Sequence, residues 1–345
     1  MKSLPYRALL LSTLLCGPAM ANNDIQACLN ELFLTGDGSL TLAQMREMCQ
    51  PSETVTTIDD VVEVERTDTK DTPIAMGNIS RRIIGERRAE NNPYVLTPHK
   101  MNYILPVMTT NGINKEAYSS FDGYEENLAD VETKFQLSLK VPLYDKSLFI
   151  EGDGLYLGFT LEAWWQIYSE NLSKPFRETN YQPEVFYIAP FDWHPFGGNT
   201  GFVLGIEHQS NGRGTLLSRS WNRVYGHLLF EKDAFALSLK PWVRLSEEEK
   251  EFPFDPDGDD NPDIEDYMGN FELGMVYQWQ DLEFTFGGRR NFSTKNGAAE
   301  LGVTFPLWGK LRGYAVAFNG YGESLIDYNY KQTRFGIGVT LNNTL

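Results

Sequence analysis

The chain has few cysteines, fewer basic than acidic side chains, and no long apolar run beyond its N-terminus. No stretch of about 18 apolar residues follows residue 21, which excludes a membrane-spanning helix. The 30 Lys and Arg against 47 Asp and Glu give a net charge of -17. That balance argues against nucleic acid as a partner, because phosphate binding needs clustered basic side chains, and it is compatible with divalent cations.

Residues 1–21 have the features of a secretory signal. Lys2 and Arg7 are basic, Ala8–Cys16 is a short apolar core, and Ala19–Ala21 reads A-M-A, a typical cleavage site. A lipoprotein anchor at Cys16 is the less favoured alternative, because no small residue precedes it. Only Cys28 and Cys49 then remain, either paired in an oxidising compartment or as two thiols, and neither alternative gives them a catalytic role.

The composition changes near residue 92. Residues 22–91 are polar and poor in aromatics, which predicts a partly helical, partly extended periplasmic segment without a large core. From residue 92 to 345, aromatic and β-branched runs alternate with turn-forming residues. They predict twelve strands: Tyr94–Thr109, Glu132–Pro142, Gly154–Tyr168, Gln182–Phe191, Gly201–Ser210, Trp221–Glu231, Ala234–Leu245, Tyr267–Trp279, Glu283–Arg290, Ala298–Phe305, Leu311–Asn319 and Gln332–Leu341.

Two all-β folds show such a pattern, a soluble sandwich and a transmembrane barrel. Segments of about ten residues match a tilted span of the hydrocarbon layer, and short gaps alternate with long ones such as Ser246–Asp266. Aromatic residues near strand ends are candidates for interfacial girdles: Tyr103, Trp164, Trp165, Trp242, Tyr277, Trp279 and Trp308. We therefore predict an all-β fold, a twelve-stranded antiparallel transmembrane β-barrel in the outer membrane, with a partly ordered N-terminal extension.

Polar residues interrupt the apolar face of one predicted strand. Phe202, Leu204 and Ile206 share their parity with His208 and Ser210, so all five side chains point to one face. In the next strand Asn222 lies within reach of His208 across the hairpin. On the outer wall of a barrel such groups face lipid, where polar side chains tend to mark function.

These residues suggest a hydrolytic triad. Ser210 is the candidate nucleophile, His208 the general base, and Asn222 the group that orients the imidazole. A lone H-x-S is usually structural, but here it belongs to a longer run, H-x-S-N-G-x5-S-R-S-x-N-R, over residues 208–223. Glu207 and Arg223, of the opposite parity, are assigned to an interior polar network.

The run resembles the signature of the outer-membrane phospholipase A family. Further matches are N-P-Y-V-L-T-P-H-K-M-N-Y at 92–103, P-F-R-E-T-N-Y at 175–181, D-N-P-D-I at 260–264 and G-Y-G-E-S-L-I-D-Y-N at 320–329. The resemblance covers most of residues 92–345 and not the N-terminal extension. It implies a calcium-dependent homodimer that hydrolyses both acyl esters of phospholipids, and those of lysophospholipids, on the outer-leaflet side.

The resemblance also implies individual roles. It makes Ser210, His208 and Asn222 catalytic, and it assigns the oxyanion hole to the Gly212 amide together with a calcium-bound water. The implied calcium ligands are oxygen atoms of Arg213 and Ser218, of Ser173 from a partner subunit, and of Asp260 at a second site. Gly214–Leu217 is less polar than the family pattern, which leaves the details of that second site open.

Other candidates are weaker. The acidic loop 255–263 has the density of a calcium loop but lacks the EF-hand glycine, since Asp260 stands in its place, so a solvated loop is equally compatible. His99, His194 and His227 are expected to be structural. The rival functions are a non-enzymatic porin or adhesin and a lipopolysaccharide deacylase.

Overall fold

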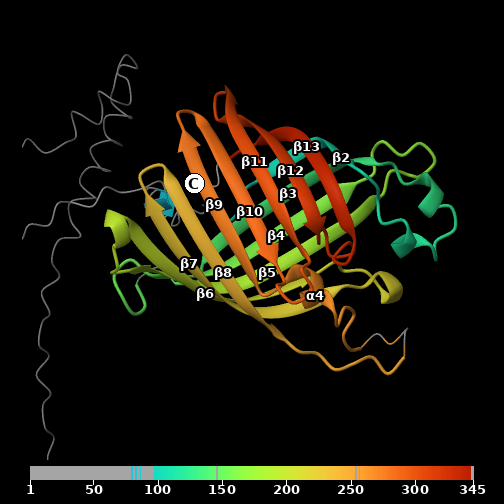
Figure 1. Cartoon of the computed structure of the whole chain (residues 1–345), viewed down its shortest axis with the longest axis horizontal. Coiled ribbons are helices and arrows are strands. Elements are labelled where there is room, and N and C mark those ends of the chain that lie inside the picture. The colour runs from blue at the N-terminus through green and yellow to red at the C-terminus, as the bar shows by residue number, and fades with distance from the viewer. Residues whose placement is uncertain are drawn as a thin grey trace, which may run out of the picture. The chain divides into compact units, whose positions relative to one another are not determined.

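Twelve long strands, each hydrogen-bonded to the next along the chain, close into an antiparallel barrel (Figure 1). The computed structural model describes residues 79, 80, 82, 83, 86, 97–144, 147–252, 255 and 257–342. The strands are β2 (Tyr103–Thr110), β3 (Val131–Pro142), β4 (Gly154–Trp165), β5 (Phe176–Phe191), β6 (Asn199–Ser210), β7 (Ser220–Lys232), β8 (Phe235–Leu245), β9 (Phe271–Trp279), β10 (Leu282–Arg290), β11 (Gly297–Trp308), β12 (Leu311–Tyr321) and β13 (Lys331–Thr340).

The sheet closes where β13 pairs with β2, with Phe335 opposite Thr109. A two-residue strand, β1 (Thr97–Pro98), adds to β3. Short helices occupy the connections: η1 (Glu116–Tyr118), η2 (Glu125–Asn127), η3 (Pro195–Gly197), η4 (Thr215–Leu217) and α4 (Ile264–Met268). Among the described residues, no helix has the length and hydrophobicity needed to cross a bilayer.

The barrel is apolar outside and polar inside. Along β13, Phe335 and Ile337 are 59% and 57% exposed. Arg334, the residue before Phe335, points to the opposite face and is fully buried. The same outward exposure recurs around the wall at Leu137, Leu204, Ile206, Leu228, Val243 and Leu301. Water would penalise this distribution and lipid favours it, so the predicted transmembrane barrel is confirmed.

Several strand boundaries differ from the prediction by three residues or more. The β5 strand begins at Phe176, six residues before Gln182, and β11 ends at Trp308, three residues after Phe305. The first strand is split, because residues 99–102 bend between β1 and β2. The β4 strand ends at Trp165, three residues early, and β9 begins at Phe271 rather than at Tyr267. The last difference arises because Tyr267 lies in α4, which ends at Gly269 with a φ of 70°.

The predicted aromatic girdle is only partly correct. Trp165, Tyr277, Trp279 and Trp308 are exposed on the outer surface. Trp164 and Trp242, however, are 0% and 6% exposed and face the lumen, and Tyr103 packs with Tyr314 in an interior cluster. The inward rings are used by charged side chains, as where the Lys134 ammonium lies 4.9 Å from the ring of Trp164.

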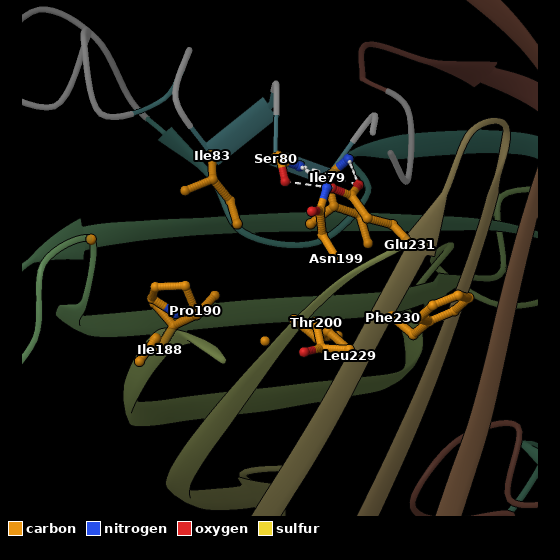
Figure 2. A pocket seen from close by; sticks show the side chains of 13 residues that line it. Ile79, Ser80, Ile83, Ile188, Pro190, Asn199, Thr200, Leu229, Phe230 and Glu231 are labelled. Atoms are coloured by element: carbon orange, nitrogen blue, oxygen red, sulfur yellow. Dashed lines mark hydrogen bonds between the residues drawn. The ribbon is translucent and has the colours of Figure 1, made fainter. Parts of the chain in front are cut away.

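A helical segment with described residues 79, 80, 82, 83 and 86 lies against the short-turn end of the barrel (Figure 2). Its backbone N–H groups at Ile79 and Ser80 donate to the Glu231 carboxylate, at 2.7 Å and 3.3 Å. Free N–H groups at a helix start are stabilised by such an acceptor. Further along, Glu86 pairs with Lys140 of β3 at 2.8 Å. The segment is thus held from two separate strands.

All described residues belong to the larger of two compact units of the chain, residues 70–345. The predicted signal sequence, most of the predicted extension and the two remaining cysteines, Cys28 and Cys49, lie outside the described residues. Their boundaries stay predictions.

Candidate active site

The register of β6 and β7 places His208 directly opposite Asn222. The imidazole Nδ1 and the amide Oδ1 are 2.9 Å apart, a hydrogen bond. Both side chains lie on the outer wall, since Leu204 and Ile206 before them on the same face are 56% and 58% exposed. The contact is therefore at the lipid-facing surface, near the end of the barrel that carries the long loops.

Ser210 occupies the next outward position of β6, opposite Ser220. Within the described part of the chain, no hydrogen bond joins its hydroxyl to His208. Residues two apart in a strand are about 6.6 Å apart at their Cα atoms and point the same way, so side-chain rotation brings the hydroxyl toward Nε2. Ser210 and His208 are thus neighbours on one face.

The loop after Ser210 is held by a buried asparagine. Asn211 accepts hydrogen bonds from the backbone N–H groups of Arg213 (3.3 Å) and Arg219 (3.0 Å), and donates to the Leu217 carbonyl at 2.7 Å. Gly212 within this loop is exposed and has a φ of 63°, a left-handed conformation that favours glycine. Its N–H lies two residues from the nucleophile and is fixed by the surrounding loop.

Two of the predicted calcium ligands meet at the rim of the barrel. The Ser218 hydroxyl donates to one Asp260 carboxylate oxygen at 2.5 Å, and the Lys250 ammonium pairs with the other at 2.6 Å. Arg213 belongs to the same β6–β7 loop, where its guanidinium donates to the Phe176 carbonyl at 2.8 Å.

Ser173 is exposed in the β4–β5 connection. Among the described residues, no cluster of three or more His, Cys, Asp or Glu side chains is arranged to hold a metal. The donors that do converge, a hydroxyl and a carboxylate with carbonyls nearby, are hard oxygen atoms of the kind calcium prefers. The residues present therefore fit a calcium ion, which they would hold with few charges of their own.

Behind the site, the inner wall carries an ion-paired cluster. Glu207, next to His208, pairs with Arg223 at 2.6 Å and with Lys240 at 2.9 Å. The Arg223 guanidinium lies 3.7 Å from the ring of Trp221, which is fully buried. As expected from their parity, Glu207 and Arg223 face the lumen. They support the strands that carry His208 and Asn222.

The remaining histidines are engaged elsewhere. His99 Nε2 contacts Glu184 in the lumen at 2.8 Å, and its ring stacks on Phe186. His194 contacts the Gly198 carbonyl in the β5–β6 turn, and His227 points inward from β7. These places are compatible with the structural roles expected for them.

The acidic loop is largely paired within the protein. Both carboxylate oxygens of Asp259 accept hydrogen bonds from Arg244 Nη2, at 2.6 Å and 2.7 Å. Asp263 accepts a hydrogen bond from the hydroxyl of Tyr328 at 2.6 Å. Of the acidic residues in this loop, Asp260 is the one that reaches the β6–β7 loop.

Sequence reasoning missed two residues that contact the site from this same long loop. Asn261 accepts a hydrogen bond from the backbone N–H of Ser220 at 3.0 Å. Glu247 accepts one from Asn222 Nδ2 at 3.0 Å. The D-N-P-D match drew attention to Asp260 and could have drawn it to Asn261, whereas Glu247 stands in a run of three glutamates that carries no signal of its own.

Comparison with known proteins gives a consistent result. Residues 79–341 match the family model described as phospholipase A1. A phospholipase A1 of Klebsiella pneumoniae is 40% identical over 277 residues, which cover 79% of this chain and 90% of the relative. Among solved structures, the outer membrane phospholipase A of Escherichia coli is 38% identical, with a TM-score of 0.70, covering 76% of this chain and 98% of that one. The same values apply to the Salmonella typhi outer membrane phospholipase dimer with bound calcium.

Proposed function

The chain belongs to the phospholipase A1 family, and from that premise we propose that it is a calcium-dependent outer-membrane phospholipase A. It hydrolyses the acyl esters of phospholipids at the sn-1 and sn-2 positions, and those of lysophospholipids. The observation that carries the proposal is the hydrogen bond between His208 and Asn222 on the lipid-facing wall, beside Ser210. An acyl ester in the outer leaflet reaches this wall without entering the barrel.

The residues divide the chemistry of acyl transfer among them. Ser210 Oγ attacks the ester carbonyl while its proton passes to Nε2 of His208. Asn222 holds the imidazole through Nδ1 and stabilises it once it is protonated. The proton then goes to the leaving alcohol, and a water molecule, deprotonated by His208, releases the fatty acid from Ser210.

The negative charge on the carbonyl oxygen needs donors fixed before the reaction. The Gly212 N–H is suited to this role, because Asn211 holds the loop and the left-handed backbone favours a residue without a side chain there. Bound calcium supplies positive charge at this oxyanion hole. Oxygen atoms of Arg213 and Ser218 would hold it, with Ser173 contributed by a second copy of the chain. Asp260 would serve a second calcium site next to Ser218.

The active form is proposed to be a homodimer. The apolar outer face around the site, with Leu204, Ile206 and Val224 exposed, offers a surface for a second copy. Ser173 is exposed and not engaged with Ser218 or Asp260, which suits a ligand donated across an interface. The calcium-bound Salmonella typhi neighbour is itself a dimer.

Fatty-acid release from phospholipid–detergent mixed micelles tests the proposal. The unmodified protein is expected to release fatty acid with calcium and not with excess chelator, and Ser210→Ala and His208→Ala to be inactive while still folded. Phospholipid with different acyl chains at the two positions reports which bond is cut. Full activity in chelator would refute the metal role, and activity of Ser210→Ala would refute the nucleophile.

A further inference from the structure

Glu247 contacts the Nδ2 end of the Asn222 side chain, and the imidazole of His208 contacts the Oδ1 end. Glu247 follows β8 by two residues, and the β7–β8 register sets Leu245 beside Asn222. Asn222 Nδ2 donates to Glu247 Oε1 at 3.0 Å while Oδ1 faces His208 Nδ1 at 2.9 Å. We propose that Glu247 is a positioning residue for hydrolysis, the fourth member of a Ser210–His208–Asn222–Glu247 chain. The inference rests on the proposed function.

The carboxylate determines which way the asparagine amide points. An ionised carboxylate only accepts hydrogen bonds, so the Nδ2 end of Asn222 must face Glu247 and the Oδ1 end must face the imidazole. Oδ1 accepts, so His208 Nδ1 carries the proton and Nε2 is left with a lone pair. Without Glu247 the amide is free to turn over and present Nδ2 to the ring. That orientation favours the tautomer protonated at Nε2, which cannot take the serine proton.

The carboxylate also supplies a charge that the amide lacks. An asparagine stabilises the imidazolium less than an aspartate does in the same place. A carboxylate one hydrogen bond further away polarises the amide and restores part of that effect, without bringing a charge into contact with the ring. Glu247 is half-buried at the loop end of the barrel, while Glu248 and Glu249 beside it are exposed.

The loop that carries Glu247 does not depend on this contact for its position. Arg244 holds Asp259 with two contacts of 2.6 Å and 2.7 Å, and the Asp259 N–H donates to the Glu248 carbonyl at 2.7 Å. Lys250 pairs with Asp260 at 2.6 Å. Replacing the Glu247 side chain therefore removes the contact with Asn222 while these anchors remain.

Micelle hydrolysis by the full chain with calcium tests the inference. We expect Glu247→Ala to lower kcat by about 10- to 100-fold, with KM within about twofold, as for other partners that orient a reacting group. Glu247→Gln keeps an acceptor oxygen, so the logarithm of its fall in kcat should be about one third of that for Glu247→Ala. Glu249→Ala, a neighbouring exposed carboxylate, is the matched control and should match the unmodified protein.

A double-mutant cycle with Asn222→Ala separates positioning from a general structural effect. If Glu247 acts through Asn222, removing it in the Asn222→Ala background changes kcat by less than about twofold. The same loss in both backgrounds, or a kcat of Glu247→Ala within about twofold of the unmodified protein, would overturn the inference. If the unmodified protein neither hydrolyses phospholipid nor reacts at Ser210 with a sulfonyl fluoride, the proposed function itself fails.

Discussion

Glu132 is the centre of a charge cluster inside the barrel, and its substitution is the sharpest test of the polar interior. Its carboxylate receives Arg177 Nε and Nη2, each at 2.9 Å, Arg334 Nη2 at 2.5 Å and Gln166 Nε2 at 3.0 Å. The Glu132, Arg177 and Arg334 side chains are fully buried. Glu132→Gln leaves Arg177 paired with the Asp327 carboxylate at 3.1 Å and removes the carboxylate that Arg334 contacts.

The size of the effect follows from that imbalance. Breaking one side of a buried ion pair costs about 3–5 kcal/mol, because an uncompensated charge stays behind. Unfolding in urea has a slope of about 3 kcal/mol per molar for a domain at the upper end of the usual range, so the midpoint should fall by about 1–1.7 M. The assay is a urea titration in detergent micelles, followed by the mobility shift between folded and unfolded barrels on unheated gels.

Glu162→Gln is the matched control. Its side chain is 21% exposed and meets Lys134 at 3.4 Å, while Lys134 keeps Glu323 at 3.0 Å. Its loss should cost less than about 1 kcal/mol. Equal midpoints for Glu132→Gln and the unmodified protein would show that water in the lumen screens these charges, and the account of a tightly paired interior would be wrong.

Further predictions concern the loops and the short-turn end. Gly212→Ala would place a Cβ 3.1 Å from the Tyr181 ring, which displaces the Gly212 N–H and should lower kcat by about 100-fold in a folded barrel. Gly214→Ala, with open space around it, is the control and should remain active. Burial raises the pKa of Asp153, but three backbone N–H groups and a tyrosine hydroxyl outweigh it and hold the pKa well below the usual range. That stabilisation is complete above the unfolded-state pKa of about 4 and is lost as the pH falls toward the folded-state pKa. The difference in melting temperature between the unmodified protein and Asp153→Asn should therefore shrink from pH 6 to pH 2. Glu231→Ala removes a helix-capping acceptor worth about 1 kcal/mol and should speed tryptic cleavage near residue 82 several-fold; unchanged cleavage would mean that the cap does not hold the segment.

Strand parity predicted most of what matters about the barrel. Period-2 alternation located all twelve strands and the outward face that carries His208 and Ser210, because side chains in a strand alternate regardless of what surrounds them. It also predicted that Asn222 lies within reach of His208, because the two strands are consecutive and pair antiparallel in the sheet. Parity does not assign chemistry. The residue types suggested the triad, and the family resemblance of the whole run implied the same roles.

Adjacent aromatics show where parity is insufficient. Trp164 and Trp165 point to opposite faces, so only one of them can lie in a girdle, and the alternation of β4 decides which. The inward Trp164 is stabilised by Lys134 from a different strand, a contact between residues 30 apart in sequence. Composition at a strand end therefore overestimates an interfacial girdle wherever the lumen also uses aromatic rings.

The contacts of the site are also of two kinds, those that strand register predicts and those that it does not. A side chain on the outer wall has neighbours within the sheet, which strand register predicts. Its other partners within the same chain come from loops at the rim. The His208–Asn222 contact is of the first kind, and the contacts of Glu247 and Asp260 are of the second. The path of a loop of more than twenty residues depends on its own ion pairs, such as that between Arg244 and Asp259, which no period in the sequence reveals. Residues that tune a lipid-facing site should therefore be sought in the rim loops as well as in the neighbouring strands.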